Sequence, residues 1–152
     1  MALRKIFFVI FAVVFMVSCS DDDSNDYHYE LLAIEDAVVP EQFEYGGIYN
    51  ISVSYIVPDD CYVNNDILYE YDNNARNVAV ISLVAESSDC ETIEVEKELI
   101  FQVQALQPSP YLFRFWQGED DNGEPIYLTV EVPVINLSNQ NANEFDKTHT
   151  KM

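Results

Sequence analysis

The sequence predicts an all-β domain built as an antiparallel two-sheet sandwich. Three observations indicate this fold class: apolar residues recur with a period of two, turn-forming residues separate the alternating runs, and no segment has a helical pattern. A small sandwich needs about seven short strands. We expect them at residues 29–39, 48–57, 66–72, 77–86, 92–106, 111–117 and 126–135.

The first four strands are separated by clear turn signals. Pro40 closes the strand at 29–39, and Gly46-Gly47 forms the next turn. The strand at 48–57 alternates apolar with polar residues, which is typical of a half-buried antiparallel strand. Asn73-Asn74 separates 66–72 from the almost wholly apolar strand at 77–86, because Asn tolerates a left-handed backbone.

The last three strands follow a polar loop that ends before Cys90. The run 92–106 places its apolar residues and Lys97 on one face and a row of Glu and Gln on the other. A helix would scatter these glutamates around its surface, so we interpret the run as a strand. In the strand at 111–117, Tyr111, Phe113 and Phe115 share a side, and Asn122-Gly123 predicts the hairpin into 126–135.

Length and composition indicate one folded domain. The chain has 152 residues, of which 49% are hydrophobic, with ten Tyr and nine Phe. High charge indicates disorder only when hydrophobicity is low, so an aromatic-rich core is expected here. We place the domain at 29–137, after a tether at 19–28 and before a polar, flexible tail at 138–152.

Residues 1–18 have the organisation of a cleaved signal peptide. Arg4 and Lys5 form a positive start, and an apolar run follows at 6–17. A membrane-spanning helix needs about 20 apolar residues, more than this run provides. Cleavage before Cys19 is therefore preferred to a membrane helix.

The residues around the cleavage site resemble the lipobox of bacterial lipoproteins. The resemblance covers Met16-Val17-Ser18-Cys19, in which Met16 replaces the usual Leu. It implies that Cys19 becomes the first residue of the mature protein and carries the acyl chains. Stable anchoring needs more than one acyl chain, a condition that a multiply acylated cysteine meets.

The next four residues, Ser20, Asp21, Asp22 and Asp23, resemble the short acidic export signal of Bacteroidota surface lipoproteins. The resemblance implies a protein that is lipid-anchored in the outer membrane and faces the cell exterior. The alternative is a solvated acidic spacer that carries no export signal.

The net charge excludes two classes of partner. The formal charge is −20, and removal of Arg4 and Lys5 leaves five basic residues against 27 acidic ones, or about −22. Nucleic acids and anionic lipid headgroups need Lys and Arg, so neither is expected as a partner. Cations and basic proteins would be attracted instead.

Two cysteines remain once Cys19 carries lipid. In an exported protein, the remaining pair, Cys61 and Cys90, is expected to form a disulfide. The bond would close a loop of about 30 residues, for which the chain-entropy model gives roughly 3–4 kcal/mol as an upper figure.

Pro108-Ser109-Pro110-Tyr111 resembles the tyrosine corner of immunoglobulin-like and fibronectin-type domains. The resemblance implies an immunoglobulin-like sandwich. The sequence departs from a true immunoglobulin domain because its cysteines fall outside the second and sixth strands and its tryptophan, Trp116, lies on the sixth. The prediction is therefore the sandwich class and not the family.

Catalytic chemistry is not expected, and no cofactor is predicted. A Ser-His-Asp or Cys-His site needs a rigidly held histidine, whereas His28 falls in the tether and His149 in the tail. A glycosidase pair needs a cleft that raises the pKa of one carboxyl group. A solvated acidic surface explains the many carboxylates better.

The run from Glu119 to Glu124 collects oxygen ligands in one loop. Calcium takes six to eight oxygens, and Asp59, Asp60 and Asp89 would add carboxylates if the loops share one end. The run lacks the spaced Asp-x-Asp-x-Asp-Gly arrangement of a calcium loop. A plain hairpin turn is preferred, and no metal ligand is assigned.

Trp116 is out of phase with the apolar row of its strand. It would face solvent beside Arg114 as a partner surface, or pack beneath a partly covered outer sheet, and the sequence leaves both open. The function that we expect is a non-enzymatic, lipid-anchored cell-surface module that binds or assists another envelope protein. The alternative is a calcium- or glycan-binding module.

Overall fold

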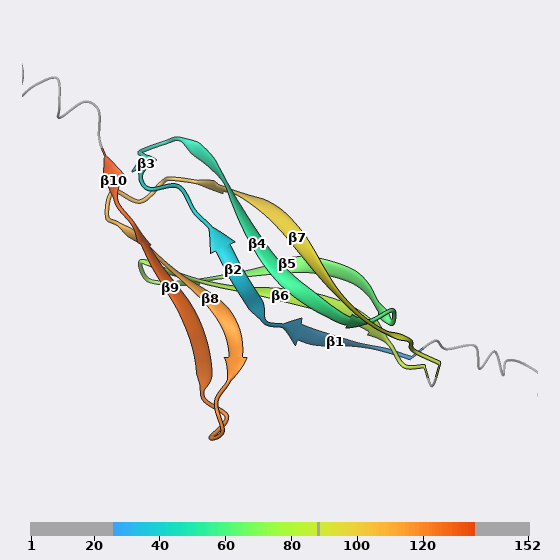
Figure 1. Ribbon diagram of the computed structural model, residues 1–152. Coiled ribbons are helices and arrows are strands. Elements are labelled where there is room, and N and C mark those ends of the chain that lie inside the picture. The colour runs from blue at the N-terminus through green and yellow to red at the C-terminus, as the bar shows by residue number, and fades with distance from the viewer. Residues whose placement is uncertain (1–25, 88, 136–152) are drawn as a thin grey trace, which may run out of the picture.

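A computed structural model describes residues 26–87 and 89–135, and these residues form ten strands and no helix (Figure 1). The all-β class is therefore confirmed, and the arrangement of sheets fits a β-sandwich. The strands are β1 (Tyr27–Leu32), β2 (Ile34–Val38), β3 (Phe43–Glu44), β4 (Ile48–Asp59), β5 (Tyr62–Asp72), β6 (Ala75–Ala85), β7 (Thr92–Gln104), β8 (Tyr111–Glu119), β9 (Pro125–Val132) and β10 (Val134–Ile135).

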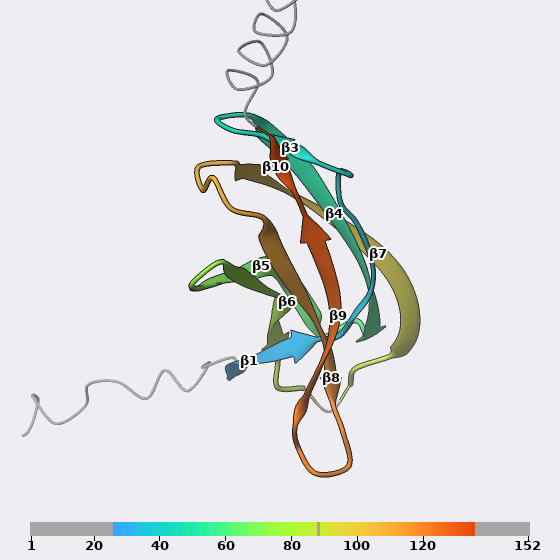
Figure 2. The same cartoon turned by 90° about the vertical axis from the view of Figure 1, so that its left-hand side faces the viewer.

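Five strands form the larger sheet, which we call sheet A. Strand β5 pairs with β6 along one edge, and the other edge of β6 is shared between two strands. The half of β6 from Val80 to Ala85 pairs with β1, and the half from Ala75 to Val78 pairs with β8. Strand β9 then pairs with β8, and their hairpin extends beyond the other strands (Figure 2).

The second layer, sheet B, has the order β2-β4-β7, and the short strands β3 and β10 pair beside it. The chain passes from sheet A to sheet B at Ala33. The single strand expected at 29–39 is therefore two strands, β1 and β2. Both Leu32 and Ile34, which flank the crossing, have buried side chains, so the apolar pattern alone gives no sign of the break.

Two pairings differ from the antiparallel arrangement that we expected. Strands β6 and β8 are parallel, and so are β3 and β10. The intervening strand β7 belongs to sheet B, so the chain returns to sheet A in its original direction. The parallel pair β6–β8 follows from that crossover.

The core lies between the two sheets. Inward-facing side chains of β4, β6 and β8 contribute most of it, including Tyr55, Val80, Phe113 and Phe115, each at most 2% exposed. The rings of Phe113 and Phe115 stack at 5.9 Å between centroids. In β4 and β8 the period of two in the sequence marks the buried face, whereas the first half of β7 departs from it, since Ile93 and Val95 are 42% and 43% exposed.

The hydroxyl of Tyr111 hydrogen-bonds to the chain that precedes it. It accepts hydrogen bonds from the backbone N–H groups of Leu106 and Gln107, at 2.9 and 3.3 Å. It also donates one to the carbonyl of Gln104, at 3.3 Å. This is the contact that the resemblance to a tyrosine corner implies.

Cys61 and Cys90 form the expected disulfide, with 5.6 Å between their Cα atoms. The bond joins the β4–β5 turn to the connection between β6 and β7. The first described residue lies at the same end, because the N–H of Glu86 donates to the carbonyl of Asp26 and the N–H of Ala85 to that of Cys61. The disulfide therefore reinforces the end at which the chain enters the domain.

The N-terminal predictions lie outside the described residues. These are the signal peptide at 1–18, Cys19, and the acidic run from Ser20 to Asp23. Within residues 26–87 and 89–135, no helix is long and apolar enough to cross a membrane. The placement of His28 in a tether is wrong, because β1 begins at Tyr27 and pairs His28 with Val84.

Candidate functional site

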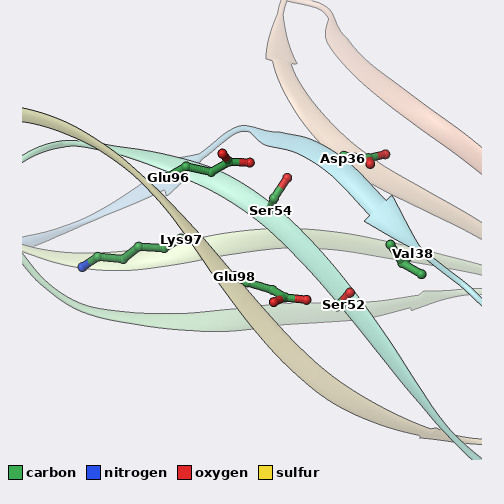
Figure 3. Close-up of a pocket in the computed structure, with 7 residues that line it drawn as sticks. All are labelled: Asp36, Val38, Ser52, Ser54, Glu96, Lys97 and Glu98. Carbon is green, nitrogen blue, oxygen red and sulfur yellow. The ribbon is translucent and has the colours of Figure 1, made fainter.

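The outward face of sheet B combines polar side chains with exposed aliphatic ones, among them Val38 and Ile100. A shallow groove of about 320 Å³ crosses it, lined by side chains of β2, β4 and β7. Figure 3 shows the carboxylates of Asp36, Glu96 and Glu98 around the hydroxyls of Ser52 and Ser54, with the amine of Lys97 pointing away. This face is therefore strongly negative.

Within the described residues, one compact group of potential metal ligands exists, at the disulfide. Asp59, Asp60, Cys61 and Cys90 have ligand atoms within 4.8 Å of one another. The two sulfur atoms are joined to each other, so neither is a thiolate. One oxygen of Asp59 accepts the N–H of Cys61, and one oxygen of Asp60 accepts the N–H of Glu91. The first hydrogen bond stabilises the β4–β5 turn, and the second joins that turn to the connection between β6 and β7.

The acidic loop between β8 and β9 is a hairpin turn organised by Asp120. Its Oδ1 atom accepts the backbone N–H groups of Asn122 and Glu124, at 2.8 and 3.0 Å. These hydrogen bonds lower the pKa of Asp120. Gly123 has a φ of +80°, the conformation that Gly adopts readily. Asp120 therefore organises the turn through the hydrogen bonds that its carboxylate accepts.

The outward face of sheet A differs from that of sheet B in carrying aromatic side chains beside its aliphatic ones. The register places Tyr29 opposite Leu83, Leu31 opposite Ile81, and Trp116 opposite Tyr127. Directly paired residues share one side of a sheet. We call this surface the Trp116 face; its members are Tyr27, Tyr29, Leu31, Leu68, Ala79, Ile81, Leu83, Trp116 and Tyr127.

Trp116 lies at the fork where β8 leaves β6 and β1 takes its place. A depression of about 150 Å³ opens there, lined by residues that include Leu31, Leu68, Trp116 and Tyr127. Trp116 itself is of intermediate exposure, so its side chain is neither fully buried nor fully open to solvent, and its role as a partner surface stays a prediction. The sequence singled out Trp116 but not its neighbours from β1 and β5, which only the pairing of distant strands brings together.

Arg114 lies on the same outward side of β8 as Trp116. Its guanidinium donates a hydrogen bond to a carboxylate oxygen of Asp72 on β5, at 3.0 Å. Both side chains are partly exposed, so the ion pair contributes little to stability. Arg114 thus borders the Trp116 face, as the sequence suggested, but as half of an ion pair.

A second hollow lies on the side of the sandwich, between β5 of sheet A and β7 of sheet B. It has a volume of about 660 Å³ and is lined mainly by aromatic and aliphatic side chains with one cation, Arg76. We call it the Arg76 groove. No local sequence pattern indicates it, because the residues of its two walls, at 67–71 and 101–107, lie far apart in the chain. The one available signal is an arginine near the start of the mainly apolar strand β6.

His28 lies on β1 between two glutamates. Its Nε2 atom is 3.6 Å from a carboxylate oxygen of Glu30, and its Nδ1 atom is 3.5 Å from one of Glu86. All three side chains are about half exposed. His149 lies outside the described residues.

Comparison with known proteins finds no relative of this chain. No family model matches the chain, and neither the curated proteins nor the solved structures contain a significantly similar one. What the protein does is therefore inferred from its own surfaces, and the Trp116 face is the strongest candidate among them.

Proposed function

We propose that this protein is a non-enzymatic, lipid-anchored module of the outer membrane surface that docks onto another envelope protein through the Trp116 face. The observation that carries the proposal is the contrast between the two outward faces. Sheet B presents carboxylates, hydroxyls and scattered aliphatic side chains such as Val38 and Ile100, whereas sheet A presents four aromatic side chains together with leucines. Contiguous apolar surface on a soluble domain is typical of a binding site.

The composition of the face fits a protein partner. Tyr29 is 73% exposed and Tyr27 is 47% exposed, although aromatic side chains gain free energy from burial. Tyrosine, tryptophan and arginine are the residues that most often dominate binding energy at protein interfaces. The fork at Trp116 would accept one apolar side chain from the partner as an anchor.

The charged residues around the Trp116 face indicate which charge the partner would carry. Asp66, Glu70 and Asp72 occupy the same side of β5, and Glu131 occupies that of β9; all four are exposed. Charges at the rim of an interface steer encounter more than they add affinity. The partner would therefore present an apolar centre with a basic rim.

The position of the face relative to the anchor supports an envelope partner. Tyr27 and Tyr29 lie on the first strand of the domain, at the end reinforced by the disulfide. Tethering at Cys19 would hold this part of the face near the membrane, where another envelope protein is available. The anchor and the export signal rest on the resemblance to Bacteroidota surface lipoproteins.

The finer fold assignment is also a proposal. We propose that the sandwich is a variant of the immunoglobulin-like class. The hydrogen bonds of Tyr111 to Leu106, Gln107 and Gln104 support this assignment. The parallel pairing of β6 with β8 is its main departure.

Co-purification from native membranes tests the docking proposal. A Tyr29→Ser, Trp116→Ser variant should lose a partner that the wild-type protein retains in fixed stoichiometry. Ile100→Ser is the matched control, since Ile100 is 63% exposed on the outward face of sheet B. Loss of the partner in the control, or its retention in the face variant, would refute the proposal. Circular dichroism should establish that both variants are folded.

A further inference from the structure

The Arg76 groove runs between two strand edges. Strand β5 pairs with β6, and β7 pairs with β4, and neither has a second partner among the described residues. An edge strand presents unpaired backbone N–H and C=O groups, to which an extended peptide can add. A volume of about 660 Å³ lies in the range of ligand sites in proteins.

Arg76 is held at the groove by uncharged groups. It is only 6% exposed, and its guanidinium lies 4.4 Å from the ring centre of Tyr71 and 5.0 Å from that of Tyr111. Its Nη1 atom donates to the carbonyls of Asn73 and Ala75, and its Nη2 atom donates to Oε1 of Gln107. Its buried Nε–H has no hydrogen-bond partner among the described residues.

No negative charge in the described residues balances this cation. The ion pairs of the described residues involve His28 and Arg114, and none involves Arg76. The residues that line the groove include no Asp or Glu, in a chain with 27 of them. Burial raises the pKa of the nearby Tyr69 to about 12, although Arg76 opposes the shift, so this phenol stays neutral at physiological pH.

A buried charge is costly unless an opposite charge and hydrogen bonds compensate it. The guanidinium has hydrogen bonds from both Nη atoms but no opposite charge, and this favours an anion such as a carboxylate in the groove. The rest of the lining suits apolar side chains, because Tyr69, Phe101 and Val103 contribute to it. The two strand edges favour a peptide, because an extended peptide backbone can continue the hydrogen-bond ladder of a sheet edge.

We propose that the Arg76 groove binds the C-terminal end of an extended peptide, with its free carboxylate at Arg76 and an apolar last side chain among the aromatic rings. The remainder of that peptide would be basic, because the domain around the groove is strongly acidic. The groove shares no residue with the Trp116 face, so each of the two proposals can be tested, and refuted, without the other.

A pair of synthetic peptides tests this proposal on the wild-type chain. We would titrate Lys-Lys-Thr-Val-Thr-Phe, as the free acid and as the C-terminal amide, into the full chain in detergent by calorimetry. The free acid should bind about tenfold or more tightly, the scale of one charge-assisted hydrogen bond. Long-range attraction to an acidic protein would instead favour the amide, which is more positive. A preference for the free acid would therefore have to come from contacts in the Arg76 groove and not from the overall charge of the protein.

Three variants test whether the preference for the free-acid peptide arises at the Arg76 groove. Arg76→Gln should abolish the preference for the free acid. Tyr71→Ala should weaken that preference, and it should not disturb the fold because the Tyr71 side chain is 75% exposed. Glu98→Gln, on the outward face of sheet B, should leave it unchanged. Equal binding of acid and amide, absence of binding at millimolar peptide, or Arg76-dependent binding of an oligoglucuronate in place of the peptide would each overturn the proposal.

Discussion

The hydroxyl of Tyr111 accepts the backbone N–H of Leu106 at 2.9 Å and so closes the connection between β7 and β8. Tyr111→Phe should destabilise the domain by about 1–3 kcal/mol, because it leaves the N–H groups of Leu106 and Gln107 without this partner. Urea denaturation measures the loss. Tyr29→Phe removes a hydroxyl from a side chain that is 73% exposed and should have no measurable effect; equal losses in both variants would contradict the account.

The Cys61–Cys90 disulfide predicts a mature domain without a free thiol. Alkylation without reductant, followed by mass spectrometry, should find both cysteines joined and unlabelled. Replacing both by Ser should lower the free energy of unfolding by about 2–5 kcal/mol. Labelling of either cysteine in the native protein would show that the bond is absent.

Two tyrosines predict a loss of stability at alkaline pH. Burial, a hydrogen bond to Glu30 and the charges of Glu30 and Asp59 raise the pKa of Tyr62 from 10.0 to about 12, and burial raises that of Tyr69 similarly. The folded protein therefore holds these protons more tightly than the unfolded chain does. Their contribution is complete below pH 10 and is lost between about pH 10 and about pH 12.

Denaturation midpoints on both sides of that interval test the prediction. Tyr62→Phe should make the decline with pH shallower, since Phe has no proton to lose. Tyr29→Phe is the control, because its side chain is largely exposed. The same decline in wild type and in Tyr62→Phe would mean that other groups control the alkaline limit.

The anchor prediction concerns residues before the described domain. Cys19→Ala should give a protein that is uncleaved or lipid-free, as labelled fatty acid would reveal. Replacing Asp21, Asp22 and Asp23 by Ala should keep the lipid but protect the protein from protease added to intact cells. Incorporation of lipid into the Cys19 variant, or unchanged proteolysis of the Asp variant, would refute the respective assignment.

Local sequence patterns predicted most strands because alternation reports a buried face directly. Strand β4 is the clearest case, with Ile51, Val53, Tyr55 and Val57 all buried. Asn73 has a φ of +55°, so its predicted left-handed turn is also confirmed. Strand β5 begins at Tyr62, before the expected residue 66, because a bulge after Tyr62 interrupts the alternation.

Pairings between distant strands could not be read from such patterns. The crossing at Ala33 and the parallel pairing of β6 with β8 depend on which sheet each strand joins. The same limit applies to the two candidate sites. Trp116 was recognisable from its phase, but the Tyr29 and Leu31 side chains beside it come from β1. The Arg76 groove exists only because β5 and β7 meet at one side of the sandwich.

Photo-crosslinking in intact cells tests the docking function most directly. A photoreactive amino acid at position 29, on the Trp116 face, should give one discrete adduct with another envelope protein, and Trp116→Ser in the same chain should abolish it. The same probe at position 100, on the outward face of sheet B, should give none. No adduct at position 29, or the same adduct from both positions, would contradict a docking role for the Trp116 face.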